Sequence, residues 1–176
     1  MPVPTVSFAT RYLKAAAGIM ITASHNPAKY NGYKVYGADG CQITTEAANS
    51  ILAEINKLDI FKDVKKADFQ TALASKQISY IDDAVYNTFL KEVKQQSVLF
   101  GEEVQKDAAI VYTPLNGTGL KPVTQILAEA GYTNIKIVPE QKLPDGNFPT
   151  CQYPNPELAE ALKLGIEYAR TNNADL

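Results

Sequence analysis

The stretch GIMITASHNPAKYNGYKVYGADG, residues 18–40, contains the only histidine of this 176-residue chain, directly after a serine. An apolar, β-branched run precedes Ser24 and His25 and predicts a short buried strand that ends at these residues. Polar residues at the end of a strand in an α/β sheet face the crevice in which such folds bind ligands. Ser, Asn and Pro also favour ordinary turns, so a functional loop and a structural turn are both open.

A serine hydrolase site is a poor interpretation of this loop. The side chains of adjacent residues normally diverge, and no second histidine exists to complete a Ser–His–Asp triad with Ser24. The G-x-S-x-G sequence that carries the nucleophile of α/β-hydrolases is also absent. On spacing alone, a functional loop and a structural turn are about equally supported.

The bulk composition excludes several classes of partner. Hydrophobic residues make up 45% of the chain and charged residues 20%, as in ordinary globular proteins. The formal net charge of −2 gives no electrostatic support for a nucleic-acid or anionic-membrane partner. Cys41 and Cys151 lie far apart in a chain with one histidine, which predicts no zinc site and favours free thiols in a reducing cytoplasm.

The apolar stretch 15–23 follows Arg11 and Lys14 and is short even for a signal-peptide core. It holds a glycine and lacks a clear small-residue cleavage site, so a buried strand is the better interpretation. No run approaches the ~18 apolar residues that a membrane span needs. We therefore expect a cytoplasmic protein with no membrane partner.

Short apolar runs alternate with helical patterns along the chain. Strands are predicted at residues 4–10, 17–23, 33–37, 108–115 and 134–140, and helices at residues 44–58, 80–100, 120–132 and 157–173. This alternation predicts an α/β fold whose sheets are covered on both faces. Residues 59–80 show no clear period, and a boundary between two units is expected near residues 80–105.

Individual residues sharpen these element predictions. Thr44 and Asn155 are suited to cap helix N-termini, with Pro156 at the first helical position after Asn155. Residues 174–176 look like the start of another strand. The first predicted strand has no helix or turn before it and the chain stops inside a strand, so we expect both ends to be truncated.

The patterning also predicts which side chains share a face. Alternation puts Lys34 and Tyr36 on one face of their strand, opposite Tyr33, Val35 and Gly37. Two apolar stripes recur at helical spacing: Ala48, Ile51, Leu52 and Ile55 in one helix, and Val85, Phe89, Leu90 and Val93 in the next.

Taken as a whole, the string TASHNP (residues 22–27), followed by YNGYKVY (30–36) and DG (39–40), resembles the phosphoserine loop of the α-D-phosphohexomutases. These form the phosphoglucomutase/phosphomannomutase superfamily. Three further segments resemble the second domain of that family: YTPLNGTGLKPV (112–123), PDGNFPTCQYPNPE (144–157) and NADL (173–176). The likeness leans toward phosphoglucomutases, covers most of the chain and is thin across residues 59–105.

The resemblance implies a piece of a four-domain protein. It implies two partial three-layer α/β/α domains with mixed sheets, truncated at both ends. Residues 1–90 would be the C-terminal part of domain I with the phosphoserine loop. Residues 91–176 would be the N-terminal part of domain II, ending before the family's Asp-rich metal loop. The remaining domains of the same polypeptide would then be its partners, and exposed sheet edges could favour self-association of the fragment.

The resemblance also implies a reaction. The intact enzyme would interconvert hexose 1-phosphate and hexose 6-phosphate, with glucose favoured, through a phosphoserine and a hexose 1,6-bisphosphate. Ser24 would carry the phosphoryl group, His25 would hydrogen-bond it, and Lys34 would shuttle a proton or stabilise charge. All three would contact substrate. Asn26, Pro27, Asn31 and Gly32 would shape the loop.

Cofactors follow from the same resemblance. Mg²⁺ would bind the phosphoryl oxygen on Ser24, with its other ligands beyond residue 176, and glucose 1,6-bisphosphate would act as activator. The fragment alone is expected to be inactive. The alternative is a non-catalytic, phosphoserine-bearing module that binds sugar phosphates. The glycine loop 116–119 is more simply a helix-start turn than a substrate contact, and residues 144–157 a rigid interdomain surface.

Overall fold

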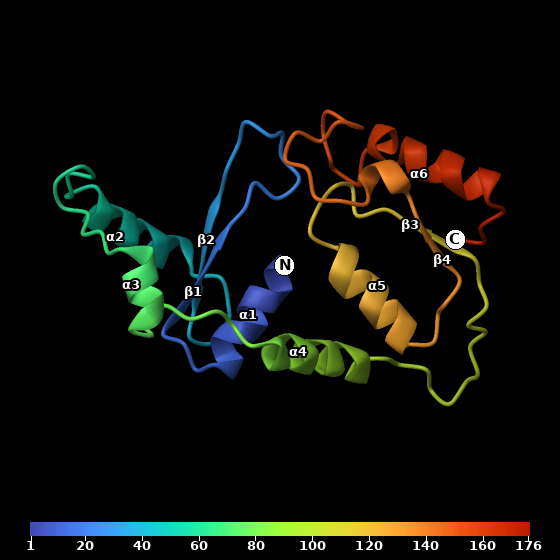
Figure 1. Cartoon of the computed structure of the whole chain (residues 1–176), viewed down its shortest axis with the longest axis horizontal. Helices are drawn as coiled ribbons and strands as arrows, with labels where there is room; N and C mark the ends of the chain where they lie inside the picture. The colour runs from blue at the N-terminus through green and yellow to red at the C-terminus, as the bar shows by residue number, and fades with distance from the viewer.

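Two separate two-stranded sheets organise the computed structural model, which describes residues 1–176 (Figure 1). Strands β1 (Ala17–Ile21) and β2 (Tyr33–Gly37) form an antiparallel pair. Strands β3 (Ile110–Tyr112) and β4 (Ile135–Ile137) form a parallel pair. The α/β fold class predicted from the sequence is confirmed, but neither sheet is mixed, because each contains a single pair of strands, antiparallel in one sheet and parallel in the other.

The predicted strand at residues 4–10 is wrong, because this segment lies within helix α1 (Val3–Tyr12). Pro2 and Pro4 flank the first helical residue, where the fixed proline φ and missing N–H suit a helix start. Thr10 is buried, and its hydroxyl donates to the carbonyl oxygen of Val6 at 2.8 Å. A short apolar run does not distinguish a strand from a buried helix by its period. The two prolines at the start of the segment are the sequence signal that favours the helix.

Helix α1 covers one face of the β1–β2 sheet, and Gly18 lets it approach. A Cβ atom at Gly18 would overlap the Thr10 hydroxyl and come within 3.3 Å of the Val6 side chain. Gly18 pairs with Tyr36, which is buried, and Met20 pairs with Lys34. The face that holds Lys34 and Tyr36 therefore packs against α1.

The opposite face of this sheet is open to solvent. Ile19, Ile21 and Tyr33 are 53%, 56% and 61% exposed. The prediction that the sheets are covered on both faces is wrong for β1–β2, because helix α1 packs on only one side of it.

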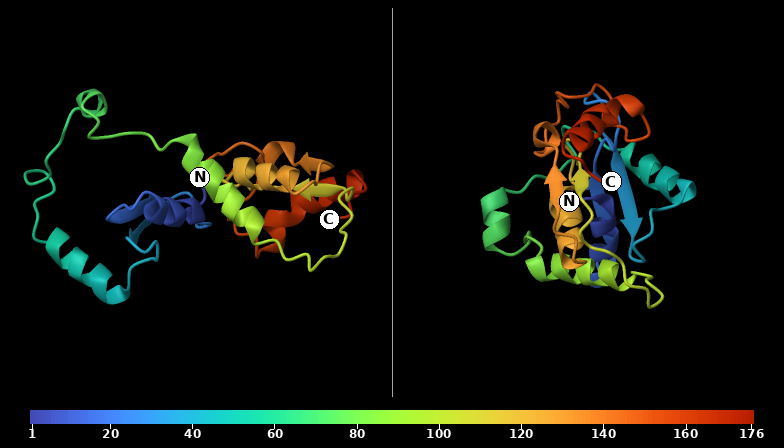
Figure 2. Two further views of the ribbon diagram at one scale, coloured as in Figure 1. Left: turned by 90° about the horizontal axis from the view of Figure 1, so that it is seen from below. Right: turned by 90° about the vertical axis from the view of Figure 1, so that its right-hand side faces the viewer.

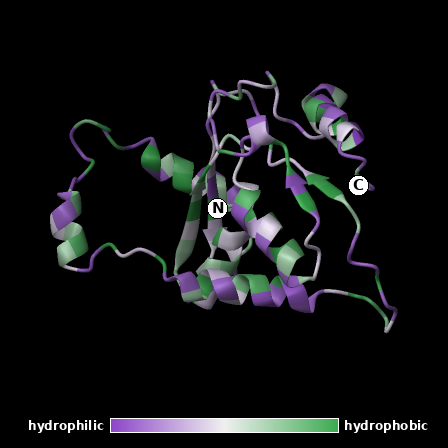
Figure 3. Ribbon diagram, turned by 45° about the vertical axis from the view of Figure 1, so that its right-hand side comes forward, coloured by the Kyte–Doolittle hydropathy of each residue, from purple (hydrophilic) through white to green (hydrophobic).

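Helices α2 (Thr45–Ile55) and α3 (Phe69–Ala74) form an arm that leaves the rest of the molecule (Figure 2). The predicted cap is confirmed, since the Thr44 hydroxyl accepts the N–H of Ala47 at 3.3 Å. The apolar stripe of α2 is not buried, since Ile51, Leu52 and Ile55 are exposed. Figure 3, which colours the ribbon by hydropathy, shows hydrophobic segments on the helices of this arm. Helical periodicity identified the helix but not a partner for its apolar side.

Helix α4 (Asp83–Gln95) joins the two parts and runs beneath α1 and α5 in Figure 1. In its predicted stripe, Val85 and Leu90 are buried, and the ring of Phe89 lies 5.5 Å from that of Phe8 in α1. Val93, at the end of the stripe, is exposed. The stripe is confirmed at its first three positions.

The second unit contains helix α5 (Leu120–Glu129), the short 3₁₀ helix η1 (Pro139–Gln141) and helix α6 (Ala159–Thr171). Helix α5 ends before Gly131, whose φ of +96° only glycine adopts easily. None of the helices is both long and apolar enough to cross a membrane.

Helix α6 begins later than predicted. The side chain of Asn155 accepts the N–H of Glu157 at 3.1 Å, within a turn that precedes the helix, and Leu158 is the capping residue. Asn155 therefore satisfies a local turn in place of a helix N-terminus. Beyond α6, the N–H of Val111 donates to the carbonyl of Leu176 at 2.8 Å, so the final residues lie along β3 in the manner of a strand edge.

Both cysteines are free thiols, as predicted. Cys41 is exposed, whereas Cys151 packs in a small core with Leu115 and Ala161. Burial raises the pKa of the Cys151 thiol, which makes Cys41 the more reactive of the two.

Because α1 and β1 touch at Thr10 and Gly18, substitutions at these two residues should have coupled effects on stability. Gly18→Ala should lower the free energy of unfolding by about 1–3 kcal/mol, because the new methyl group overlaps the Thr10 hydroxyl. In a Thr10→Ala background the cost should shrink, with a coupling of about 0.5–3 kcal/mol. Urea unfolding followed by circular dichroism measures both.

Gly146→Ala is the matched control, because no atom lies within 4 Å of the position of its new Cβ. Equal costs for Gly18→Ala in the two backgrounds would contradict the overlap with Thr10.

Candidate functional site

The loop that carries Ser24 is closed at its base by one backbone hydrogen bond. The N–H of Thr22 donates to the carbonyl of Gly32 at 2.9 Å and so extends the β1–β2 pairing by one step. A Cβ atom at Gly32 would overlap the Thr22 carbonyl oxygen, which explains the need for glycine there. The side chain of Asn31 accepts the Gly32 N–H at 2.9 Å. The predicted loop-shaping roles of Asn31 and Gly32 agree with this geometry.

Ser24 itself adopts a left-handed backbone conformation with a φ of +56°. Its N–H donates to the hydroxyl of Thr22 at 3.0 Å, which holds this turn. The expectation that the side chains of Ser24 and His25 diverge is wrong: the Ser24 Oγ and the His25 Nδ1 lie 3.4 Å apart. Both residues are exposed, so a ligand can reach them.

The Ser24 loop faces the second unit across a cleft of about 590 Å³. Residues 22–25 and Ala28 line one side of the cleft, and residues 112–118 and 144–146 are on the other side with Phe148 and two prolines, Pro154 and Pro156. Figure 1 shows the tip of the β1–β2 loop beside the long segment that leads to α6. Two segments far beyond Ser24 in the sequence thus face it, which the strand-end argument alone does not foresee.

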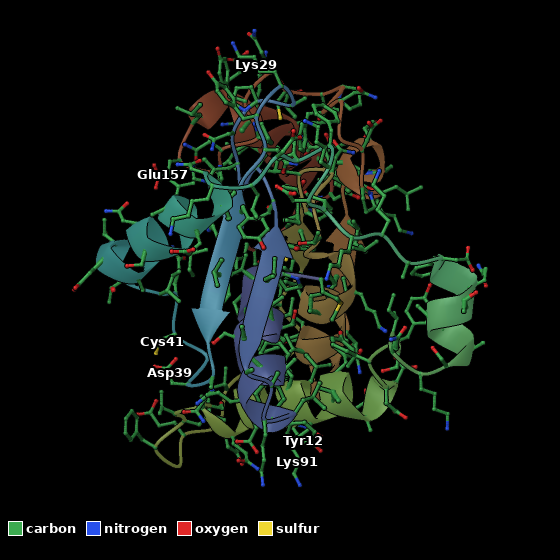
Figure 4. All side chains as sticks on the ribbon, turned by 90° about the vertical axis from the view of Figure 1, so that its left-hand side faces the viewer. Tyr12, Lys29, Asp39, Cys41, Lys91 and Glu157 are labelled. Atoms are coloured by element: carbon green, nitrogen blue, oxygen red, sulfur yellow. The ribbon has the colours of Figure 1, made fainter.

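A second hollow, of about 380 Å³, lies on the other side of the loop. His25, Lys29 and Tyr30 line it together with Tyr153 and Leu158, which precede α6. In Figure 4, Lys29 lies at the end of the sheet opposite to Asp39 and Cys41. The second unit therefore lines a hollow on each side of the loop, and part of the segment 144–157, predicted as an interdomain surface, lines the cleft.

Lys34 lies outside the lining of the cleft. It is half-buried on β2, pairs with Met20, and makes no hydrogen bond or ion pair through its side chain in the structure. None of the residues lining the cleft is a lysine or an arginine. The role of Lys34 in the reaction stays a prediction.

The far wall of the cleft is a strained turn at Leu115 and Asn116, with φ of +49° and +55°. The Asn116 side-chain amide donates to the carbonyls of Glu140 and Leu143 at 3.1 and 2.9 Å. The Asn116 N–H donates to the Gln141 carbonyl at 2.8 Å. Asn tolerates the left-handed region better than most residues, and here its amide also ties the turn to the segment after β4.

Gln141 holds the same turn from beneath. Its side chain is almost fully buried, at 1% exposure, and the Thr113 hydroxyl donates to its Oε1 at 2.6 Å. Its Nε2 donates to the Thr150 hydroxyl at 3.0 Å. Buried polar groups that are all paired make a rigid support. Nothing in the sequence pattern singled out Gln141, whereas the Asn-Gly pair at 116–117 is an ordinary turn signal.

Tyr112 also lines the cleft, at the end of β3. A Cβ atom at Gly119 would overlap its hydroxyl oxygen, so glycine at the start of α5 makes room for the phenol. Burial raises the pKa of Tyr112 above its ordinary value.

A Mg²⁺ site is not formed by these residues on their own. No group of three or more His, Cys, Asp or Glu side chains lies together in the structure. Mg²⁺ prefers several oxygen ligands in octahedral array, and Asp145 is the one carboxylate that lines the cleft.

Family models match both parts of the chain. Residues 1–61 match the model described as phosphoglucomutase/phosphomannomutase, alpha/beta/alpha domain I. Residues 86–176 match the model described as alpha/beta/alpha domain II of the same family.

Individual relatives agree with these models. A Staphylococcus saprophyticus phosphoglucomutase is 41% identical over 173 residues, which are 98% of this chain and 31% of that protein. A Haemophilus influenzae protein named as a candidate phosphomannomutase is 35% identical over 178 residues, covering 99% of this chain and 35% of its own. This chain thus spans about a third of the length of these relatives.

A solved structure shows the same fold. The crystal structure of a candidate phosphomannomutase from Thermus thermophilus matches 96% of this chain and 34% of its own, with a TM-score of 0.73 and 24% identity. At that identity the likeness establishes the arrangement of the α/β elements.

The hydrogen bonds of Gln141 beneath the far wall should contribute to the stability of the fold. Gln141→Leu should lower the free energy of unfolding by about 1–3 kcal/mol, because buried partners such as the Thr113 hydroxyl lose their hydrogen bond. Chemical denaturation measures this loss.

Gln125→Leu is the control, since the bond from Gln125 to Glu129 is exposed and should contribute within about 0.5 kcal/mol. Similar costs for the two substitutions would show that the Gln141 network adds nothing to the wall.

Proposed function

This chain belongs to the phosphoglucomutase/phosphomannomutase family, and on that premise we propose that it supplies the phosphoryl-carrying serine of a hexose-phosphate mutase. The observation that carries the proposal is the position of Ser24, exposed in the TASHNP loop and facing a cleft between two α/β units. A group that gives and takes phosphoryl must be accessible to both ends of a sugar phosphate, and an exposed loop residue meets that need.

The proposed reaction consists of two phosphoryl transfers. In the first, the bond between phosphorus and the Ser24 oxygen breaks while a bond forms from phosphorus to a free hydroxyl of the hexose phosphate, whose proton leaves to a base. The product is a hexose 1,6-bisphosphate. In the second, the Ser24 oxygen attacks the other phosphoryl group, and the sugar oxygen leaves and takes up a proton from the same base, which now acts as an acid. Such transfers depend on positioning and charge stabilisation more than on covalent chemistry.

The side chain of His25 lies close to the reacting oxygen. With its Nδ1 3.4 Å from the Ser24 Oγ, a protonated imidazole can donate to a phosphoryl oxygen on Ser24. Lys34 would supply a second positive charge or carry the sugar hydroxyl proton. No lysine or arginine lines the cleft, but Lys29 lines the hollow on the other side of the loop together with His25. Lys29, Lys34 and the remaining domains of the polypeptide are therefore the proposed sources of further positive charge.

The finer assignments are part of the proposal. Glucose is the favoured hexose, in line with the 41% identical relative named phosphoglucomutase. Mg²⁺ on the phosphoryl oxygen of Ser24 and glucose 1,6-bisphosphate as activator complete the proposed enzyme, and its location is the cytoplasm. The length of the native open reading frame distinguishes this enzyme from the alternative binding module, which needs no further domains.

Ser24→Ala, in the longer polypeptide that the proposal requires, should abolish mutase turnover, because no oxygen remains to carry the phosphoryl group. A coupled assay with the bisphosphate activator present measures it. Ser50→Ala is the control, since Ser50 is an exposed residue of α2 that donates only to the Glu46 carbonyl. Turnover of Ser24→Ala within about threefold, only ~0.7 kcal/mol in barrier, would refute the assignment.

Lys34→Met in the same polypeptide should lower turnover by roughly ten- to a thousandfold, the scale of a lost acid–base or electrostatic group. Steady-state kinetics give turnover and substrate affinity separately. Lys91→Met is the control, because Lys91 lies at the far end of the molecule from the loop (Figure 4). If Lys34→Met changes neither quantity, Lys34 is an ordinary strand lysine.

A further inference from the structure

We propose that the hydroxyl of Thr22 donates a hydrogen bond to the phosphoryl group carried by Ser24. Thr22 would thus be a contact residue for the travelling group, two positions before its carrier. This inference rests on the proposed function in one respect only, namely that Ser24 is the residue that becomes phosphorylated.

The Thr22 hydroxyl has one hydrogen-bond partner in the protein and one donor to spare. Its oxygen accepts the N–H of Ser24 at 3.0 Å. A threonine hydroxyl can accept and donate at once, and no protein group accepts the proton of this one. Thr22 is half-buried and lines the same cleft as Ser24. One O–H donor is therefore left free at the wall of the cleft.

The Thr22 hydroxyl is also held in a fixed position. The backbone of Thr22 is tied to Gly32 by the bond that closes the loop. A β-branched side chain has few χ1 choices, and acceptance from Ser24 selects among them. The hydroxyl is thus fixed beside the backbone of Ser24, and rotation about the Ser24 Cα–Cβ bond can bring a phosphoryl oxygen within hydrogen-bonding distance of it.

The cleft offers a phosphoserine little positive charge. A phosphoserine carries about −1.5 to −2 charge near pH 7 and offers three strong acceptor oxygens. No lysine or arginine lines the cleft, and Asp145 on the far wall repels an anion. Neutral donors next to Ser24 therefore carry more of the stabilisation than they would in a basic pocket. A bond from a hydroxyl to an ionised acceptor is among the stronger hydrogen bonds.

The experiment uses the 176-residue chain with phosphoserine incorporated at position 24. Its second pKa is followed by ³¹P NMR in three variants: unsubstituted, Thr22→Val and Thr22→Ser. Valine keeps the branched shape and removes the donor, whereas serine keeps the donor. Thr44→Val is the matched control, because Thr44 caps α2 in the same way, accepting a backbone N–H at 3.3 Å, but lies outside the cleft.

A donor to the dianion lowers the phosphoserine pKa, so its loss in Thr22→Val should raise that pKa by about 0.5 to 1. Thr22→Ser and Thr44→Val should titrate like the unsubstituted chain. The other titratable groups lining the cleft are His25, Tyr112 and Asp145, and they are the same in every variant.

Three results would overturn the proposal. An unchanged pKa in Thr22→Val would mean that no donation occurs. A lowered pKa in Thr22→Val would mean that the Thr22 hydroxyl normally keeps the Ser24 N–H away from the phosphate. Without that hydroxyl, the Ser24 N–H would donate to the phosphate instead. If Thr22→Ser raised the pKa as much as Thr22→Val, the effect would not come from the lost donor, because serine keeps the hydroxyl.

A second measurement applies if the valine variant does not fold. In the unsubstituted phosphoserine chain, the Thr22 hydroxyl proton should exchange slowly above the second pKa and show a correlation to phosphorus. Absence of that correlation overturns the proposal. Because the phosphoserine is installed chemically, these outcomes do not depend on turnover, so failure of the mutase assignment is detected separately by the Ser24→Ala assay.

Discussion

One backbone hydrogen bond, from the N–H of Thr22 to the carbonyl of Gly32, fixes the site. It is the last step of the β1–β2 pairing, and it pins both ends of the loop 23–31 where the chain leaves the sheet. With the ends held, the Thr22 hydroxyl can hold Ser24 in its left-handed conformation, and that conformation brings the serine oxygen toward His25. The position of the Ser24 oxygen, which is proposed to react, thus depends on a backbone contact that involves none of the side chains proposed to take part in catalysis.

The two walls of the cleft are fixed by different means. On the Ser24 side the support is backbone pairing in an exposed sheet, with one face covered by α1. On the far side it is a buried amide network in which Asn116 and Gln141 satisfy the polar groups of a strained turn. The exposed wall carries the residues proposed to react, and the buried wall carries residues that only shape the space. Strain at both walls is consistent with a site whose geometry is held by its surroundings.

The sequence predicted those parts of the fold that local chemistry decides. Strand β1, strand β2 and the Thr44 cap each depend on neighbouring residues, and all three form as predicted. The expectation that β1 is buried is wrong, because its residues alternate between exposed and half-buried. The prediction for segment 4–10 was wrong because its apolar run suits a strand or a buried helix equally. The prolines at its start favour a helix, and the packing of Thr10 on Gly18 stabilises that helix. The stripe of α2 failed for a related reason, since periodicity shows an apolar side but not whether anything covers it.

The sequence predicted the residues on only one side of the cleft. The strand-end argument and the TASHNP string pointed to Ser24 and His25, which line the cleft. The far wall comes from residues 112–118 and 144–156, and Gln141 is a polar residue in a 3₁₀ turn with no distinguishing pattern. Such a residue is recognised only when its buried partners are known.

The isolation of the α2–α3 arm has a consequence for how the chain opens. An 11-residue helix is marginal by itself in water, and no side chain of α2 is buried against another element. Its amide hydrogens should therefore exchange with solvent through local fraying, at a free energy far below that of global unfolding. The amides of β1 and β2, which carry the Ser24 loop, should remain protected meanwhile. The arm should thus open at a lower free energy than the rest of the chain, and this local opening should not reach the cleft.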